Sequence, residues 1–387
     1  MRSRYAVPLA VLALALTGCG GDDPAPGAGG EPTASASSSA STSPSPTDDP
    51  TPGESTSASP SETAGGGVGT AEDPEPLDAG KALLDWTPVP GSVTDTVTRG
   101  GGWTLTVDEL GKKAELSSDG ASAGTATDKR HRISDALLDG RYAVVVVQDK
   151  RETQPAVATV YDLGKGAKSF TLDGSSDVPT VTGGTWALGE GHLVHATVRD
   201  GAYCAATVDL ATQKSTIGWC APDRSGFNAA RITPAGDSLL TFDDSRPSCR
   251  TVVALSGTGT TPFPGVPACT AWEGLVTDDG AVWAVVPKPR RVEEAVLYAH
   301  TGDSWLDLGP GTSGSLTWCA GAAYFVRDPQ TDGSPAALMR FDGTALDVVY
   351  ESSGPQSFVA SPRCGGDTLT ITSLSEDGDE QVSADLG

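Results

Sequence analysis

The 387-residue sequence has little of several things that common functions need. It has only four histidines and two methionines, and its 26 Lys and Arg are outnumbered by 50 Asp and Glu, which gives a net charge of −24. A nucleic-acid or anionic-lipid partner is therefore disfavoured, because both need a basic face. There is no Cys-x-x-Cys pair and no Cys–His cluster, so a zinc site is not expected. We expect no metal and no cofactor.

Long apolar runs are also missing. Arg2 and Arg4 precede an apolar segment at 6–16, which is too short to cross roughly 30 Å of hydrocarbon as a helix. No later stretch approaches the eighteen apolar residues of a membrane helix. A positive start, a short apolar run and small residues before a Cys form the order of an export signal. Residues 1–18 are therefore predicted to be a signal peptide.

The end of this segment carries a specific motif. Leu16-Thr17-Gly18-Cys19 resembles the lipobox of bacterial lipoproteins, here of an actinobacterial type. The resemblance implies that Cys19 is diacylated, with palmitate or a similar chain, and becomes the mature N-terminus. The protein would then be anchored through this lipid alone to the outer, extracytoplasmic face of the cell membrane. An ordinary signal peptide that happens to end at a Cys is the alternative.

A linker of different composition follows. Residues 20–79 are mainly Ser, Thr, Pro, Gly, Ala, Asp and Glu, with no aromatic residue and no Lys or Arg. Such a segment has too little apolar surface to offset its ordering entropy. We therefore predict that residues 19–79 comprise the lipidated Cys and a disordered linker, which spans on the order of 40–45 Å as a flexible coil. A plain spacer is favoured over a carrier of O-glycans, which the composition permits.

From residue 80 the sequence repeats. Short apolar runs alternate with turn residues, which is typical of all-β structure. A strand ending, clearest at 160–163 and 208–212, recurs seven times with aligned positions at 119, 162, 209, 254, 299, 342 and 385. A spacing of about 40–45 residues, with four strands per unit, is that of a β-propeller blade. We predict a seven-bladed propeller over 80–387; a two-domain β-sandwich is the alternative.

Two segments carry a resemblance to WD40-like and TolB-like propellers. The turn at 233–237, Thr-Pro-Ala-Gly-Asp, is similar to their Ser-Pro-Asp-Gly turn, and 208–212 is similar to their Asp-Leu strand exit. The likeness lies in the repeat pattern, since no Trp-Asp dipeptide ends a strand. The last repeat stops after its third strand at 385–387. We predict that residues 83–91, which are similar to the fourth strand at 305–311, complete blade seven and close the ring.

Besides Cys19, the chain has six cysteines, so an exported protein is expected to form disulfides. Cys204 and Cys220 are symmetric about the predicted turn between a third and a fourth strand, and so are Cys249 and Cys269 in the next blade. Residues that are symmetric about a hairpin turn face each other within disulfide distance. The pairs 204–220 and 249–269 are therefore predicted.

The remaining two cysteines occupy matching positions in blades six and seven. Cys319-Ala-Gly aligns with Cys364-Gly-Gly. A bridge between them would join two neighbouring blades near the closure of the ring. Two buried free thiols are the alternative, and the sequence leaves both open.

Catalytic motifs are not evident. His192 and His195 lie three apart on a predicted strand and so point to opposite faces. His131 is expected at a solvated strand end and His300 in a turn, so each histidine is interpreted as structural or exposed. No nucleophile elbow, zinc-protease motif or phosphate-binding loop occurs. No catalytic residue is assigned.

Acidic groups give weaker candidates. The pairs at 243–244 and 278–279 are possible glycoside-cleaving or calcium sites, and the segment 376–380 is a possible weak calcium site. Turn residues that bond the local backbone are the favoured interpretation.

One face of the predicted propeller is rich in charge. The loops between second and third strands, a frequent binding surface, are also rich in acids, so this face is charged but not basic. We therefore expect ordinary polar loops. Their basic residues are Lys112, Lys113, Lys150, Arg151, Arg199, Arg246, Lys288, Arg290, Arg291 and Arg327.

The expected function follows from fold and anchor together. We expect a monomeric, non-enzymatic recognition or scaffold module that is held outside the membrane and binds a protein or a cell-wall glycan. The alternative is a secreted propeller enzyme, a hydrolase or lyase that acts on glycans through carboxylates. Carboxylates that converge at the mouth of the central channel with raised pKa values would favour the enzyme.

Overall fold

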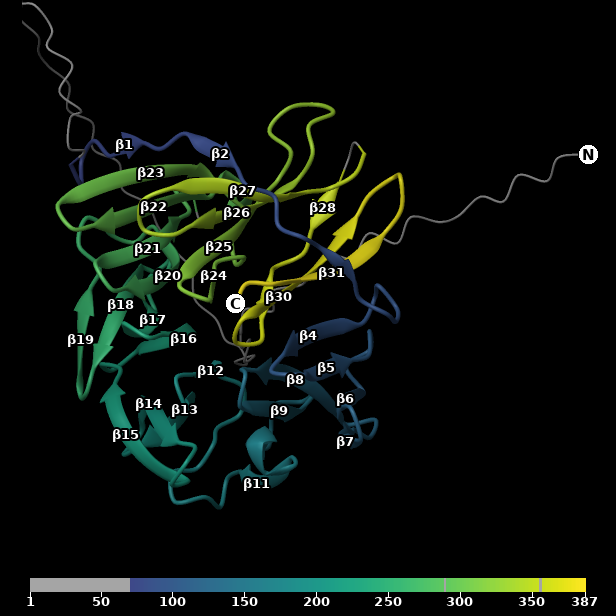
Figure 1. The fold of residues 1–387 in the computed structure, drawn as a ribbon. Helices are drawn as coiled ribbons and strands as arrows, with labels where there is room; N and C mark the ends of the chain where they lie inside the picture. Colours follow the sequence, from purple (N-terminus) through teal and green to yellow (C-terminus); the bar gives the residue numbers. More distant parts are fainter. Residues whose placement is uncertain (1–69, 289, 355–356) are drawn as a thin grey trace, which may run out of the picture. The chain divides into compact units, whose positions relative to one another are not determined.

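The computed structural model describes residues 70–288, 290–354 and 357–387. The predicted signal peptide, Cys19 and most of the predicted linker lie outside these residues. The described chain is almost entirely β-structure, and Figure 1 shows its seven sheets arranged around a central axis. The fold is a seven-bladed β-propeller, as the repeat predicts.

In the first four blades the strands follow chain order from the axis outwards. Blade one consists of β4 (Thr96–Gly100), β5 (Trp103–Val107), β6 (Lys113–Ser118) and β7 (Ala121–Ala126). Blade two consists of β8 (His131–Leu138), β9 (Tyr142–Asp149), β10 (Val157–Asp162) and β11 (Lys168–Leu172), with the short helix η1 (Leu163–Lys165). Blade three consists of β12 (Trp186–Gly189), β13 (His192–Arg199), β14 (Ala202–Asp209) and β15 (Lys214–Cys220). Blade four consists of β16 (Ser225–Thr233), β17 (Gly236–Asp243), β18 (Arg250–Ser256) and β19 (Gly259–Pro262).

Blades five to seven also use strands from the start of the described chain. Blade five consists of β20 (Ala271–Thr277), β21 (Gly280–Val285), β22 (Val296–Thr301), β23 (Ser304–Pro310) and β1 (Glu75–Pro76), with the helix η2 (Val292–Glu294). Blade six consists of β24 (Thr317–Cys319), β25 (Ala322–Arg327), β26 (Ala337–Phe341), β27 (Leu346–Glu351) and β2 (Ala79–Lys81). Blade seven consists of β28 (Phe358–Val359), β29 (Arg363–Cys364), β30 (Thr368–Leu374), β31 (Glu380–Asp385) and β3 (Thr87–Pro88).

The ring closes as predicted. β3 pairs antiparallel with β31 and is the fourth strand of blade seven. The N–H of Val89 extends this pairing by donating to the carbonyl oxygen of Gln381 at 2.8 Å. Trp86, just before β3, packs against the buried cluster that contains Ile371. The two ends of the propeller domain therefore share one sheet.

The chain before β3 makes pairings that the sequence does not predict. β1 pairs in parallel with β23 and β2 with β27, at the outer edges of blades five and six. Leu77, between the two strands, packs against the core of these blades. Pairing at an edge uses backbone groups and needs few apolar side chains, so composition does not reveal it. Ordered pairing begins at Glu75, inside the predicted linker and ahead of the predicted domain start at residue 80.

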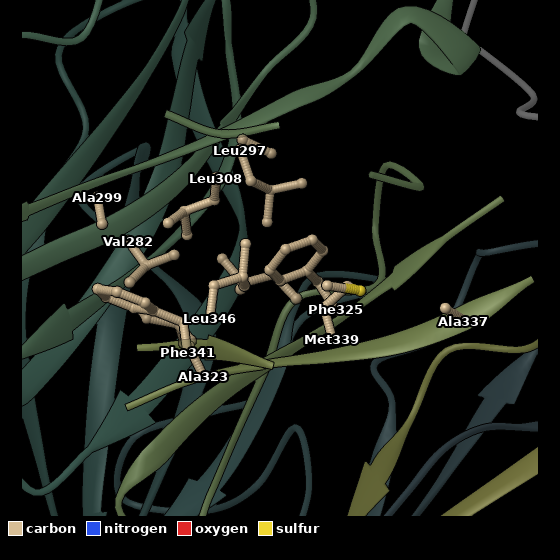
Figure 2. Close-up of a cluster of buried hydrophobic side chains, with 13 residues drawn as sticks. Val282, Leu297, Ala299, Leu308, Ala323, Phe325, Ala337, Met339, Phe341 and Leu346 are labelled. Atoms are coloured by element: carbon tan, nitrogen blue, oxygen red, sulfur yellow. The ribbon is translucent and has the colours of Figure 1, made fainter. Parts of the chain in front are cut away.

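The core consists of apolar layers between neighbouring blades. Figure 2 shows the layer in which Leu297 and Leu308 of blade five meet Phe325 and Met339 of blade six. Equivalent layers join blades one to two, two to three, three to four, four to five and six to seven. β9 lies between two such layers, which explains its continuous apolar run at 143–146.

The interface between blades seven and one is different. At its inner end the two backbones nearly touch: a Cβ atom on Gly100 would lie 1.5 Å from the carbonyl oxygen of Gly365. A Cβ atom on Gly365 would lie 2.1 Å from the carbonyl oxygen of Arg99. Glycine is therefore required at both positions. Within the described chain no buried apolar cluster spans this interface.

All six cysteines of the domain form disulfides. Cys204 and Cys220 face each other in β14 and β15, as the hairpin symmetry predicts. The predicted bond between Cys249 and Cys269 is also present, on either side of the β18–β19 hairpin.

The third bond joins Cys319 of β24 to Cys364 of β29. The question that the sequence leaves open is thus answered by a bridge between blades six and seven. It links the first strands of these blades, close to the axis.

Candidate functional site: the central channel and the seam groove

The central channel is a cavity of about 280 Å³ to which every blade contributes. Its walls come mainly from the first strand of each blade, because these strands lie nearest the axis. Aromatic and aliphatic side chains dominate, including Trp186 and Trp318, and the charged groups in the wall are Arg231 and Arg363. The lining residues are 98, 136–138, 186–188, 230–232, 275, 314, 317–318 and 361–364.

Arg231 is held by a buried carboxylate. Glu273 of β20 is only 2% exposed and lies 3.5 Å from the guanidinium of Arg231. The same carboxylate accepts the N–H groups of Gly314 at 2.7 Å and Leu316 at 3.3 Å. Burial raises the pKa of Glu273, and Arg231 and these N–H groups oppose the rise. The pair therefore ties blades four, five and six together and leaves little of either group for a ligand.

Backbone bulges determine where the side chains of Arg231 and Glu273 point. β16 is irregular between Asn228 and Arg231, and β20 between Ala271 and Glu273. A bulge inserts an extra residue and so re-aims the side chains that follow. Simple alternation along either strand does not predict where Arg231 and Glu273 point.

Arg363 is in a different situation. Its guanidinium lines the channel and has no hydrogen-bond partner among the described residues. Burial lowers the pKa of Arg363, and the carboxylate of Asp135 on β8 opposes this. Burial raises the pKa of Asp135, opposed first by the Ser134 hydroxyl and then by Arg363. A guanidinium stays charged throughout the physiological range, so its N–H donors are available to a ligand.

The channel does not assemble a pair of catalytic carboxylates. Asp135 and Glu273 have raised pKa values, but they lie on blades two and five, and neither lines the cavity. Among the described residues no group of three or more His, Cys, Asp or Glu is placed to hold a metal ion.

The other acidic candidates lie in or beside turns. Asp243 accepts the hydroxyl of Ser245 and the N–H groups of Cys249 and Ser245, and these bonds lower its pKa. The pair at 278–279 lies at the turn between β20 and β21. At 376–380 a local turn forms, in which the N–H of Gly378 donates to the carbonyl of Ser375.

The four histidines make structural contacts. His192 bonds Asp237 of the next blade at 3.0 Å, and His195 is fully buried, stacked on Trp186 with 5.2 Å between ring centroids. His300 lies in β22 and not in a turn as predicted. His300 is paired with Trp305 of β23, and their ring centroids lie 4.1 Å apart. His131 begins β8 and bonds Asp128 at 2.7 Å.

His192 and His195 are expected to give opposite pH dependences of stability. The bond to Asp237 raises the pKa of His192 above its usual 6.5, so its contribution is full below that pH and is lost as pH rises through the folded-state pKa. Burial lowers the pKa of His195, so its contribution is present above pH 6.5 and is lost as pH falls.

Urea unfolding from about pH 5 to pH 8 separates the two effects. His192→Gln should remove the gain in free energy of unfolding on acidification, and His195→Gln should remove the loss. Identical pH slopes in the wild type and both variants would contradict this assignment.

The charged loop face agrees with the interpretation as ordinary polar loops. Lys288 and Arg291 lie 3.8 and 2.5 Å from Glu294. Arg327 donates to the carbonyl oxygens of blade five at 2.7 and 3.0 Å, so it has a structural role. These three basic groups of the face are thus neutralised or bonded locally.

A second concavity lies between blades seven and one, and we call it the seam groove. Its volume is about 640 Å³. Serine and threonine hydroxyls dominate its walls, in contrast to the channel. It is lined by Thr87, Arg99, Gly100, Gly102, Trp103, Thr104, Ser117, Ser118, Asp119, Thr368, Ser383 and Asp385.

Comparison with known proteins supports the fold alone. No family model matches the chain, and no curated protein matches it in sequence. The β-propeller domain of the Trilobed protease from Pyrococcus furiosus is similar over 80% of this chain and 95% of that chain, with a TM-score of 0.50 and 9% identity. A prolyl endopeptidase is similar over 79% of this chain with a TM-score of 0.48 and 14% identity, and this chain spans 48% of it. A chain of the mitotic checkpoint complex has a TM-score of 0.48 and 11% identity, over 84% of this chain and 99% of that one.

Within the described ranges, no helix has both the length and the apolar character needed to cross a bilayer.

Proposed function

We propose that this protein is a lipid-anchored, extracytoplasmic recognition module that binds a partner at its central channel. The observation that carries the proposal is Arg363, an exposed residue in the wall of a cavity built from all seven blades, whose side chain makes no hydrogen bond within the described chain. Arg363 is an exposed residue, so a ligand that enters the channel can reach its N–H donors. A carboxylate or another anionic group of a partner would accept hydrogen bonds from them.

The shape of the channel limits what enters. A cavity of about 280 Å³ is at the lower end of the usual range for ligand sites, roughly 300–1,000 Å³. It therefore suits a chain end or one or two side chains of a larger partner. Trp186 and Trp318 belong to the same wall as Arg363, and aromatic and arginine side chains are common at the centres of protein interfaces.

Anchoring at the membrane rests on the sequence. The lipobox-like ending at Cys19 and the polar linker after it would hold the propeller on the outer face of the cell membrane. Among the described residues no Asp or Glu lines the channel, so this cavity does not favour the rival enzyme that works through paired carboxylates.

The test uses the full chain in its native membranes. Partners are cross-linked to wild type, to Arg363→Ala and to Arg151→Ala, which removes an exposed cation from the loop face, and are then captured and compared. A partner that is retained by wild type and Arg151→Ala but lost with Arg363→Ala supports the proposal. Equal capture by all three proteins would refute the role of the channel. In the same cells, Cys19→Ala should move the protein out of the membrane fraction.

A further inference from the structure

The seam groove arises from a polar sequence pattern. In β30, Leu369 and Ile371 pack toward blade six. Successive residues of a strand point to opposite faces, so Thr368, Thr370 and Thr372 face blade one. In β31 the same alternation sends Gln381, Ser383 and Asp385 to that side, because Val382 packs toward blade six. The face of blade seven toward blade one is therefore built from hydroxyl, amide and carboxylate groups. The interfaces between the other neighbouring blades are apolar.

These small side chains leave a gap. The backbones meet at Gly100 and Gly365 near the axis, and the two sheets diverge outwards from there. In the other interfaces, large apolar side chains such as Phe325 fill this space. Serine and threonine are too short to do so, and a groove of about 640 Å³ remains, well within the range of ligand sites.

Polar groups behind the groove lack partners. The hydroxyl of Thr370 and the amide oxygen of Gln381 are buried, at 2% and 4% exposure for the residues, and have no hydrogen-bond partner among the described residues. Buried polar groups are normally bonded, so these two groups show that the packing between blades seven and one leaves polar atoms unmatched, unlike the apolar layers between the other blades.

The walls of the groove favour an uncharged ligand. Arg99 bonds the hydroxyl of Ser383 at 3.1 Å, which uses one of its five N–H donors. Asp119 and Asp385 add two carboxylates, so acids outnumber the cation, and the whole chain is strongly acidic. An anionic ligand would be repelled. A ligand with many hydroxyl groups can donate to the carboxylates and accept from Arg99 at once.

One aromatic side chain completes the site. Trp103 at the start of β5 is half-buried and lines the groove. The C–H face of a sugar ring is slightly positive and packs well on the negative face of an indole. The groove thus offers hydroxyl, carboxylate and guanidinium groups that can bond to the hydroxyl groups of a sugar ring. Its indole can pack against the C–H face of the ring.

From these contacts we propose that the seam groove binds a neutral polyhydroxylated ligand, a short segment of an uncharged glycan. This site is separate from the central channel, and its ligand chemistry is different. The protein would then have two recognition sites, one for a partner at the axis and one for a glycan at the seam.

Calorimetry with the full chain tests this proposal. The probes are linear tetramers of glucose and of N-acetylglucosamine, with a tetramer of galacturonic acid as the anionic comparison. At least one neutral tetramer should bind and should change the tryptophan fluorescence of the protein, to which Trp103 contributes, whereas the anionic tetramer should not. Asp119→Asn should weaken binding by about tenfold, since it removes a hydrogen bond to a charged group.

The matched control is Asp303→Asn, an exposed acid at the turn between β22 and β23 of blade five, the counterpart of the turn that holds Asp119. It should bind the tetramer like wild type. The proposal is wrong if neither neutral tetramer binds at millimolar concentration, if Asp119→Asn binds as well as Asp303→Asn, or if the anionic tetramer binds best. Hydrogen exchange of β31 can also be compared with that of the third strands of the other blades. If β31 exchanges faster and no sugar slows it, the seam is a place where the ring opens, and the proposed glycan site is wrong.

Discussion

Replacing Glu273 by glutamine is expected to lower the free energy of unfolding by about 2–3 kcal/mol, because it removes the buried carboxylate that pairs with the half-buried Arg231. The loss is enlarged by the backbone. The carboxylate accepts the N–H groups of Gly314 and Leu316, and an amide side chain would turn its own N–H donors toward at least one of them. Three blades therefore lose a shared contact through one substitution.

The control is an ion pair of the same kind at the surface. Glu115 lies 2.7 Å from Lys113 on β6, and both side chains are exposed. Water and salt screen such a pair, so Glu115→Gln should leave stability nearly unchanged. Urea unfolding at neutral pH measures both variants. Equal effects of the two substitutions would show that the buried pair contributes no more than a surface pair.

Trp86→Ala is expected to lower the free energy of unfolding by about 3 kcal/mol, the lower end for truncation of a large aromatic residue, because its side chain is only partly buried. The substitution removes the bond from the indole N–H to the carbonyl oxygen of Val349, at 2.9 Å, and the edge-on contact with Tyr350, at 5.5 Å between centroids. These contacts connect the segment that closes the ring to blade six.

Leu83→Ala is the matched control, three residues earlier in the same segment. Its side chain is 53% exposed, so its truncation should have little effect. Chemical unfolding monitored by circular dichroism compares the two variants. If Trp86→Ala is as stable as Leu83→Ala, the segment before β3 does not stabilise the closed ring.

The parts of the fold that repeat were predictable from the sequence. Seven copies of one strand ending gave the number of blades, and the missing fourth strand at the C-terminus indicated closure by residues 83–91. The disulfides of blades three and four followed from hairpin symmetry. Each of these inferences compares one part of the chain with another, so none needs knowledge of distant packing.

The candidate sites were not predictable in this way. Arg231 and Glu273 come together because two bulges shift their strands by one residue, and a bulge has no clear sequence signal. β1 and β2 pair through their backbones. The seam had a visible signal in the alternating threonines of β30, but only the closed ring shows that this face meets blade one.

β1, β2 and β3 also determine which outer sheet edges can accept a further strand. β1 and β3 each contain a proline, Pro76 and Pro88, which has no N–H to offer a further strand. β2 has three residues and ends in Lys81, and β19 of blade four ends in Pro262. Among the outer margins of the described chain, only β7, β11 and β15 are longer and free of proline. Any foreign strand that extends a sheet of this protein, including one from a neighbouring molecule during aggregation, should therefore join blades one to three.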